Sequence, residues 1–163
     1  MHRYLTILAI LTIASCGQRV KKSSDMSIMP FELILYDAHY SLGYAHKFVV
    51  TNRDLTIIFK GELEGEKDTT LFETDLQPNE ALKNLSNISI DDLLENYSNP
   101  YIEDGSQITV VLKKNNKTKT IHLSNYYQPD IGFAIEFING IIPTKYKINY
   151  NKERLLKNQE KNK

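Results

Sequence analysis

Three side chains in the first strand-like region are of types that bind metal ions. Asp37, His39 and His46 offer one carboxylate and two imidazoles, and a turn between the two histidines would bring them to neighbouring strand ends. A tetrahedral zinc site needs three or four such ligands. Asp37 and His39 also lie two residues apart, the spacing of a polar pair on one strand face. The three residues are therefore metal candidates, and the sequence assigns no metal or other cofactor.

Five tyrosines form a second group that could contact a ligand, because a tyrosine offers both a stacking face and a hydroxyl to a sugar or a peptide. They are Tyr36, Tyr40, Tyr44, Tyr126 and Tyr127. The chain has no tryptophan, which is the usual platform for sugar stacking. Tyrosines on strands also serve as half-buried packing residues, so contact and packing are both open.

Acidic residues cluster at Asp91, Asp92 and Glu95, and again at Glu103 and Asp104. Paired carboxylates act as acid and base only where burial separates their pKa values. The first three alternate with leucines, which favours the solvated face of a helix. The chain contains neither a Gly-x-Ser-x-Gly elbow nor a glycine-rich phosphate loop, and such motifs mark many nucleophilic and nucleotide sites. The sequence thus assigns no catalytic residue and favours a non-catalytic protein.

The single cysteine, Cys16, follows a short basic start and an apolar run over residues 4–13. That run is too short for a permanent transmembrane helix, and its layout is that of an export signal. The residues just before the cysteine, Ile13-Ala14-Ser15-Cys16, resemble the lipobox of bacterial lipoproteins.

The lipobox resemblance implies that residues 1–15 are a signal peptide and that cleavage makes Cys16 the new N-terminus. It further implies that the Cys16 thiol carries diacylglycerol and that its amine receives another acyl chain. Each buried methylene contributes about 0.8 kcal/mol, so two or three chains hold a protein firmly in a membrane. By the sorting rule of that family, Gly17 in place of aspartate implies the outer membrane.

Charge argues against nucleic-acid binding. The chain has 20 basic and 20 acidic residues, and loss of Arg3 with the signal peptide leaves one excess negative charge. Such a chain has no strong field that would attract polyanions. With Cys16 acylated the folded part has no cysteine, so its stability must come from packing one hydrophobic core.

The elements that position these residues begin after a polar tether over residues 16–29, which spans at most roughly 40 Å. Four strands are predicted at residues 31–36, 47–51, 55–59 and 69–76 as an antiparallel meander, with the first strand central because both its faces are apolar. Pro78 is predicted to open a helix that ends at Ile88. Ser89 is predicted to cap a second helix that ends at Asn99-Pro100.

A second block of strands follows, joined by a two-residue turn at Asn115-Asn116. This turn sets Ile108 opposite Leu123 and Val110 opposite Ile121. Pro129 is predicted to open a helix that stops at Asn139-Gly140 and buries a stripe at helical spacing, namely Ile131, Ala134, Ile135 and Ile138. A last strand is predicted at residues 145–150.

Together these elements predict one α+β domain over residues 30–150 with a polar helical tail over residues 151–163. The sheet is expected to be antiparallel, with about six strands in two blocks and two or three helices packed on it. The runs DGSQITVVLKKNNKTKTIHLSNYY and EFINGIIP resemble small uncharacterised lipoproteins of Bacteroidota-type bacteria, a resemblance that implies no activity.

The sequence therefore predicts a lipid-anchored protein of the cell envelope with a non-catalytic binding or scaffolding domain. Its expected partners are the membrane, through the lipid, and a protein or another envelope component. One alternative is an envelope hydrolase that uses a metal at Asp37, His39 and His46. Another is an immunity or inhibitor lipoprotein.

Overall fold

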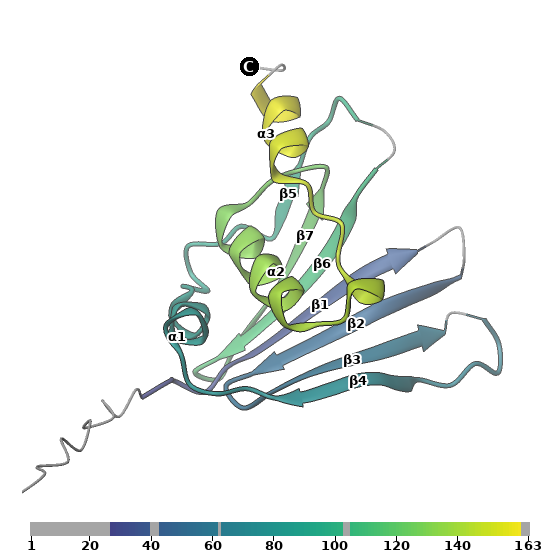
Figure 1. The fold of residues 1–163 in the computed structure, drawn as a ribbon. Helices are drawn as coiled ribbons and strands as arrows, with labels where there is room; N and C mark the ends of the chain where they lie inside the picture. Colours follow the sequence, from purple (N-terminus) through teal and green to yellow (C-terminus); the bar gives the residue numbers. More distant parts are fainter. Residues whose placement is uncertain (1–26, 40–42, 62, 103–104, 161–163) are drawn as a thin grey trace, which may run out of the picture.

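The computed structural model describes residues 27–39, 43–61, 63–102 and 105–160 (Figure 1). The predicted signal peptide, Cys16 and most of the predicted tether lie outside these residues, as do Tyr40, Glu103, Asp104 and the side chain of His39. Among the described residues, no helix combines the length and apolarity needed to cross a bilayer.

The described chain forms one α+β domain around a seven-stranded sheet. The strands are β1 (Glu32–His39), β2 (Tyr44–Thr51), β3 (Asp54–Gly61), β4 (Thr69–Asp75), β5 (Asn96–Ser98), β6 (Gln107–Lys114) and β7 (Lys117–Ser124). The helices are α1 (Glu80–Asn87), α2 (Pro129–Ile141), the 3-10 turn η2 (Thr144–Tyr146) and α3 (Lys152–Glu160). The order across the sheet is β4-β3-β2-β1-β6-β7-β5, antiparallel except where β5 runs parallel to β7. The prediction of about six antiparallel strands missed β5 and its parallel pairing.

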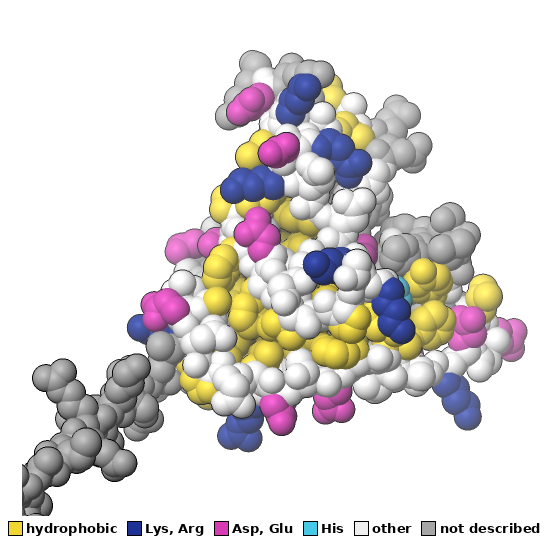
Figure 2. Space-filling view, in the orientation of Figure 1, with side chains coloured by type: hydrophobic (Ala, Val, Ile, Leu, Met, Phe, Trp, Pro, Cys, Tyr) yellow, Lys and Arg dark blue, Asp and Glu magenta, His cyan; other side chains and the backbone are white. Residues whose placement is uncertain are grey.

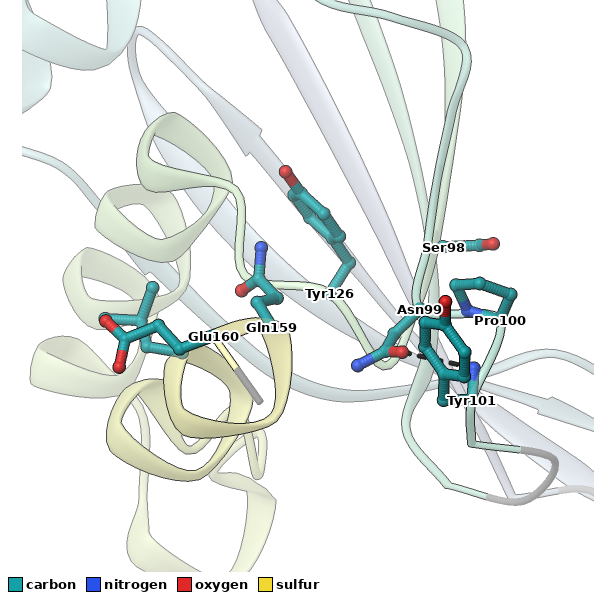
Figure 3. Close-up of a pocket in the computed structure, with 8 residues that line it drawn as sticks. Ser98, Asn99, Pro100, Tyr101, Tyr126, Gln159 and Glu160 are labelled. Atoms are coloured by element: carbon teal, nitrogen blue, oxygen red, sulfur yellow. Dashed lines mark hydrogen bonds between the residues drawn. The ribbon is translucent and has the colours of Figure 1, made fainter. Parts of the chain in front are cut away.

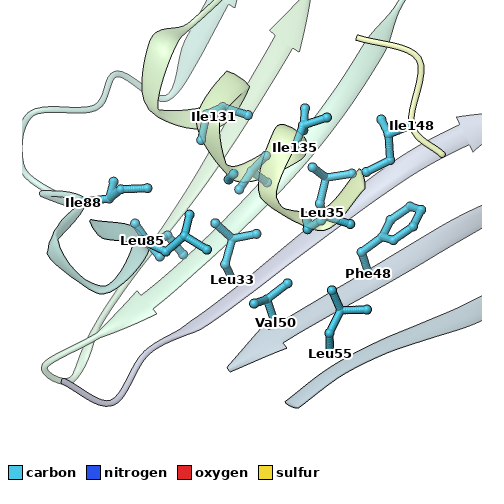
Figure 4. Close-up of a cluster of buried hydrophobic side chains, with 14 of the residues drawn as sticks. Leu33, Leu35, Phe48, Val50, Leu55, Leu85, Ile88, Ile131, Ile135 and Ile148 are labelled. Carbon is cyan, nitrogen blue, oxygen red and sulfur yellow. The ribbon is translucent and has the colours of Figure 1, made fainter. Parts of the chain in front are cut away.

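Strand β1 lies at the centre of the sheet, as its two apolar faces predict. Leu33 pairs with Val50 on one side and with Leu112 on the other. The side chains of Leu33, Val50 and Leu112 face the helices, and together with apolar side chains of α1 and α2 they form part of the core (Figure 4). Full burial of one leucine, isoleucine or phenylalanine contributes roughly 1.5–3 kcal/mol. In the described part of the chain, the helices cover this one face of the sheet only (Figure 1).

The β6–β7 hairpin has the predicted register, with Ile108 opposite Leu123 and Val110 opposite Ile121. Its turn is formed by Asn115 and Asn116, whose φ angles are 50° and 61°. Both angles lie in the left-handed region, which asparagine tolerates better than most residues.

Helix α2 begins at the predicted Pro129 but ends later than predicted. Gln128 caps it, with the Ile131 N–H donating to Oε1 at 2.7 Å. The helix continues through Asn139 and Gly140 to Ile141. Asn139 does not end the helix; its side chain instead bonds to both backbone groups of Ile148, each at 2.9 Å. That clamp holds residues 147–150 in an extended segment after η2, where the sequence predicts a strand.

The helix predicted to begin at Ser89 does not form, and residues 89–95 make turns before β5. Lysine side chains from the neighbouring hairpin explain the difference: Lys114 donates to the Ile88 carbonyl at 3.4 Å, and Lys119 donates to the carbonyls of Ile90 and Leu93. These carbonyls therefore need no helical partner. The preceding helix, α1, starts at Glu80 with Asn79 as its N-cap, so Pro78 precedes the helix and does not open it.

Candidate functional site

One hollow of the described chain is a trough between α3 and the segment that follows β5. Its volume is about 250 Å³, and its lining consists of Ser98, Asn99, Pro100, Tyr101, Tyr126, Leu156, Gln159 and Glu160. In Figure 3, Gln159 and Glu160 come from α3 on one side and Asn99 and Tyr101 from the opposite wall, with the Tyr126 ring between them. The side chains of Tyr101 and Leu156 are 69% and 37% exposed, so the trough is open to solvent.

The wall after β5 is held by the buried Asn99. The backbone N–H of Asn99 donates to the Ser124 carbonyl at 2.9 Å, which continues the pairing with β7. Its side-chain Oδ1 accepts from the Tyr101 N–H at 3.2 Å, and its Nδ2 donates to the Asn158 carbonyl in α3 at 3.3 Å. One amide thus shapes the loop and ties it to the opposite wall.

Helix α3 forms the other wall and is fixed to the domain by both apolar and polar contacts. Leu155 is buried beneath it. Gln159 Oε1 accepts from the Tyr127 N–H at 3.1 Å, next to the floor of the trough. Asn151 caps the helix, since its Oδ1 accepts from the Arg154 N–H at 2.9 Å. The sequence predicts a polar helical tail over residues 151–163; the helix is present at Lys152–Glu160, and it also builds part of the candidate site.

The floor of the trough is supported by a cluster of tyrosines. The Tyr126 ring lies 5.3 Å from that of Tyr97, measured between centroids, and Tyr127 stacks on Tyr150 at 5.6 Å. The Tyr150 hydroxyl donates to the Tyr126 carbonyl at 2.8 Å and accepts from the Gln128 N–H at 3.0 Å. Burial raises the pKa of Tyr150 to about 12. The phenol is therefore protonated at neutral pH and can keep donating to the carbonyl of Tyr126.

The other tyrosines proposed as ligand contacts do not converge on this trough. Tyr127 is buried beneath it, and a Cβ on Gly132 would come within 2.6 Å of its ring. Tyr36 is on the sheet face away from the helices, where Lys47 lies over its ring at 5.9 Å. Tyr44 lies at the far end of β2 and stacks on Phe59 at 5.4 Å. Tyr40 lies outside the described residues.

The metal candidates lie at the same far end of the sheet. Asp37 and His46 are directly opposite each other in the β1–β2 register, and His39 is opposite Tyr44. The His46 ring is packed among aromatic rings, with Tyr146 at 5.8 Å. Among the side chains that the structure describes, no group of three or more His, Cys, Asp or Glu residues could hold a metal ion. A metal at these residues was an alternative to the main prediction, and it stays untested.

The acidic residues after α1 are exposed, in agreement with a solvated role, although they are in turns and not on a helix. Asp91 accepts from Lys117 Nζ at 2.7 Å, and this bond lowers the pKa of the carboxyl. His122, the remaining histidine of the described chain, lies on the outer sheet face, where its Nδ1 bonds to Thr109 Oγ1 at 3.2 Å.

Of the tyrosines that the sequence proposes as ligand contacts, Tyr126 lines the trough, and the sequence analysis did not propose Asn99, Tyr101 or Gln159. The sequence predicts only the end of a helix at Asn99-Pro100, and it places Gln159 in the polar helical tail. One signal was available, because Leu155 and Leu156 interrupt an otherwise polar tail and indicate a face that packs.

Comparison of the chain with protein-family models, with curated proteins and with solved structures found no significant match.

Proposed function

We propose that this chain is a lipid-anchored protein of the cell envelope, held in the outer membrane through Cys16, whose domain binds a protein or another envelope component without transforming it. The trough is the single observation that carries the binding role. Its lining combines two tyrosine rings, the apolar side chains of Pro100 and Leu156, and amide and hydroxyl groups, with Glu160 as its one carboxylate. Such groups stack and hydrogen-bond. From these groups we infer that the surface binds its ligand without changing it chemically.

The position of the trough supports a tethered binding domain. The described chain begins beside the turn of the β6–β7 hairpin, since Pro30 and Phe31 share a surface hollow with Asn115 and Asn116. Helix α3 and the trough lie at the other end of the domain (Figure 1). A lipid on Cys16, joined through the tether to Pro30, would attach the domain to the membrane at the end opposite the trough. That is the arrangement a membrane-bound receptor needs.

Photo-crosslinking tests the binding role. A photoreactive amino acid replaces Tyr101 at the trough or, as a control, Leu63 in the loop after β3, and both positions are highly exposed, at 69% and 63%. We expect adducts with an envelope component from position 101 and none of the same mass from position 63. The same adducts from both positions, or no adduct from position 101, would contradict the proposal.

Lipidation is tested separately with Cys16→Ser. The hydroxyl cannot replace the thiol as the acyl acceptor, so we expect an unlipidated, uncut precursor. Metabolic labelling with a fatty acid, together with the intact mass, measures both effects. A Cys16→Ser protein that still fractionates with membranes at the mature mass would rule out the lipid anchor.

A further inference from the structure

The outer edge of β5 offers backbone groups for pairing with another strand. β5 is the last strand of the sheet. Its bonds to β7 include the His122 N–H donating to the Glu95 carbonyl at 2.7 Å and the Asn99 N–H donating to the Ser124 carbonyl at 2.9 Å. In a parallel pair these bonds come from alternate residues of a strand.

The alternation fixes which groups of β5 point away from the sheet. Because Glu95 and Asn99 bond to β7, the backbone of Tyr97 faces β7, while the N–H and C=O groups of Asn96 and Ser98 point outward. Within the part of the chain that the structure describes, no backbone group pairs with these outward groups. Both residues are exposed, so an added strand could reach them.

The trough begins where this edge ends, because Ser98 belongs to both. Glu160 is the one charged residue of the lining. Among the described residues it forms no ion pair. A ligand that carries a cation therefore complements the trough, and a ligand that carries an anion does not. In Figure 3, Glu160 lies on the wall opposite Tyr101, and its carboxylate is at the outer edge of that wall, pointing away from the Tyr126 ring.

We propose that β5 and the trough together bind an extended peptide segment that carries an arginine or a lysine. The main chain of the peptide pairs with Asn96 and Ser98 as an added strand. The basic side chain crosses the trough, with its apolar stem against Tyr126 and its charge toward Glu160. This proposal rests on the proposed binding function and names the class of partner. A glycan could stack on the tyrosines but would leave the outward backbone groups of β5 unused.

The probe is a synthetic peptide, acetyl-Thr-Val-Arg-Val-Thr-amide, titrated into the purified mature protein in detergent micelles. Its control is the same peptide with glutamine in place of arginine. We expect the arginine peptide to bind about tenfold more tightly, the effect of one charge-assisted contact. Glu160→Gln should abolish this preference and leave the affinity for the glutamine peptide unchanged. No binding at millimolar peptide, or a preference that survives Glu160→Gln, would overturn the proposal.

Backbone pairing is tested with Ser98→Pro, which removes the outward N–H and leaves the groups that face β7 in place. Proline is tolerated on the outer side of an edge strand. We expect at least a fivefold loss of affinity for both peptides, the effect of roughly one lost hydrogen bond, and little change for Ser98→Ala. N-methylation of the arginine in the peptide gives a second test that leaves the protein intact. Unchanged affinity in either test would overturn strand pairing.

The crosslinking results at position 101 distinguish a partner that is not a peptide from the absence of a binding function. If envelope glycans crosslink at position 101, and Tyr126→Ala prevents this while Ser98→Pro does not, the domain is a receptor but its ligand is not a peptide. If nothing crosslinks at position 101, the binding function itself fails.

Discussion

At the scale of single residues, neutral amides shape the candidate site. Asn99, Gln128 and Gln159 each satisfy backbone groups in or beside the trough. One amide side chain carries both donors and acceptors, so it can join two segments without burying a charge. Among the described residues, no buried side-chain nitrogen or oxygen lacks a hydrogen-bond partner. Hydrogen bonds within the chain therefore hold the walls of the trough.

Tyr150 gives a prediction about stability at high pH. Its pKa in the folded state, about 12, lies above the ordinary value of 10.0 because burial disfavours the phenolate. Below the ordinary value the phenol is protonated in both states, so its contribution is complete. As the pH rises toward 12, the unfolded chain loses this proton first, and the free energy of unfolding falls.

The measurement is the urea midpoint against pH for the native chain and for Tyr150→Phe. The phenylalanine variant is less stable at neutral pH by roughly 1–3 kcal/mol, because two backbone groups lose their partner. Its deficit should shrink as the pH rises from about 10 to about 12. Tyr101→Phe, at an exposed position, should follow the native curve. If the urea midpoints of the native chain and of Tyr150→Phe change in parallel with pH, the raised pKa of Tyr150 is contradicted.

Only part of the site could be predicted from residue types. Tyr126 could be proposed because tyrosine carries stacking chemistry wherever it lies, and it does line the trough. Tyr101 and Gln159 are separated by more than fifty residues, and they meet only because β5 pairs with β7 and α3 folds back over both. Their convergence depends on contacts such as the hydrogen bond from the Asn99 side chain to the Asn158 carbonyl. The local sequence does not indicate such contacts.

At the scale of elements, the predictions succeeded where the signal is local. The β6–β7 register follows from two asparagines and the alternation around them, and α2 follows from Pro129 and its apolar stripe. The segment over residues 89–95 was predicted wrongly because distant residues decide its structure. Lys119, more than twenty residues along the chain, supplies donors to its carbonyls, and such a contact outweighs a weak helix propensity.

Asn139 joins two elements, and we expect its loss to be costly. Asn139→Ala leaves both backbone groups of Ile148 without their partner, which should lower the free energy of unfolding by roughly 1–3 kcal/mol. The exposed neighbour Asn149 is the matched control, and Asn149→Ala should change stability by less than about 0.5 kcal/mol. Urea unfolding measures both variants. Equal midpoints would mean that the extended segment does not depend on the clamp.

At the scale of the whole molecule, the domain is a sheet with helices on one face. The described chain begins beside the β6–β7 turn, and the trough lies at the opposite end (Figure 1). On the face that the helices cover, apolar side chains and lysines share the surface, with acidic groups near its rim (Figure 2). This surface carries no single-sign field, so the recognition that we propose relies on the trough and not on long-range attraction.

The last prediction concerns α3, which the sequence presents as a tail and the structure packs onto the domain. Deletion of residues 151–163 exposes the site that Leu155 fills and leaves the Tyr127 N–H without Gln159. Burial of one leucine contributes roughly 1.5–3 kcal/mol, so the free energy of unfolding should fall by about 2 kcal/mol. A matched truncation that removes only residues 161–163 keeps both contacts and should unfold at the native midpoint. If the longer deletion also unfolds at the native urea midpoint, α3 is not part of the folded unit, and a trough with α3 as its wall could not persist in solution.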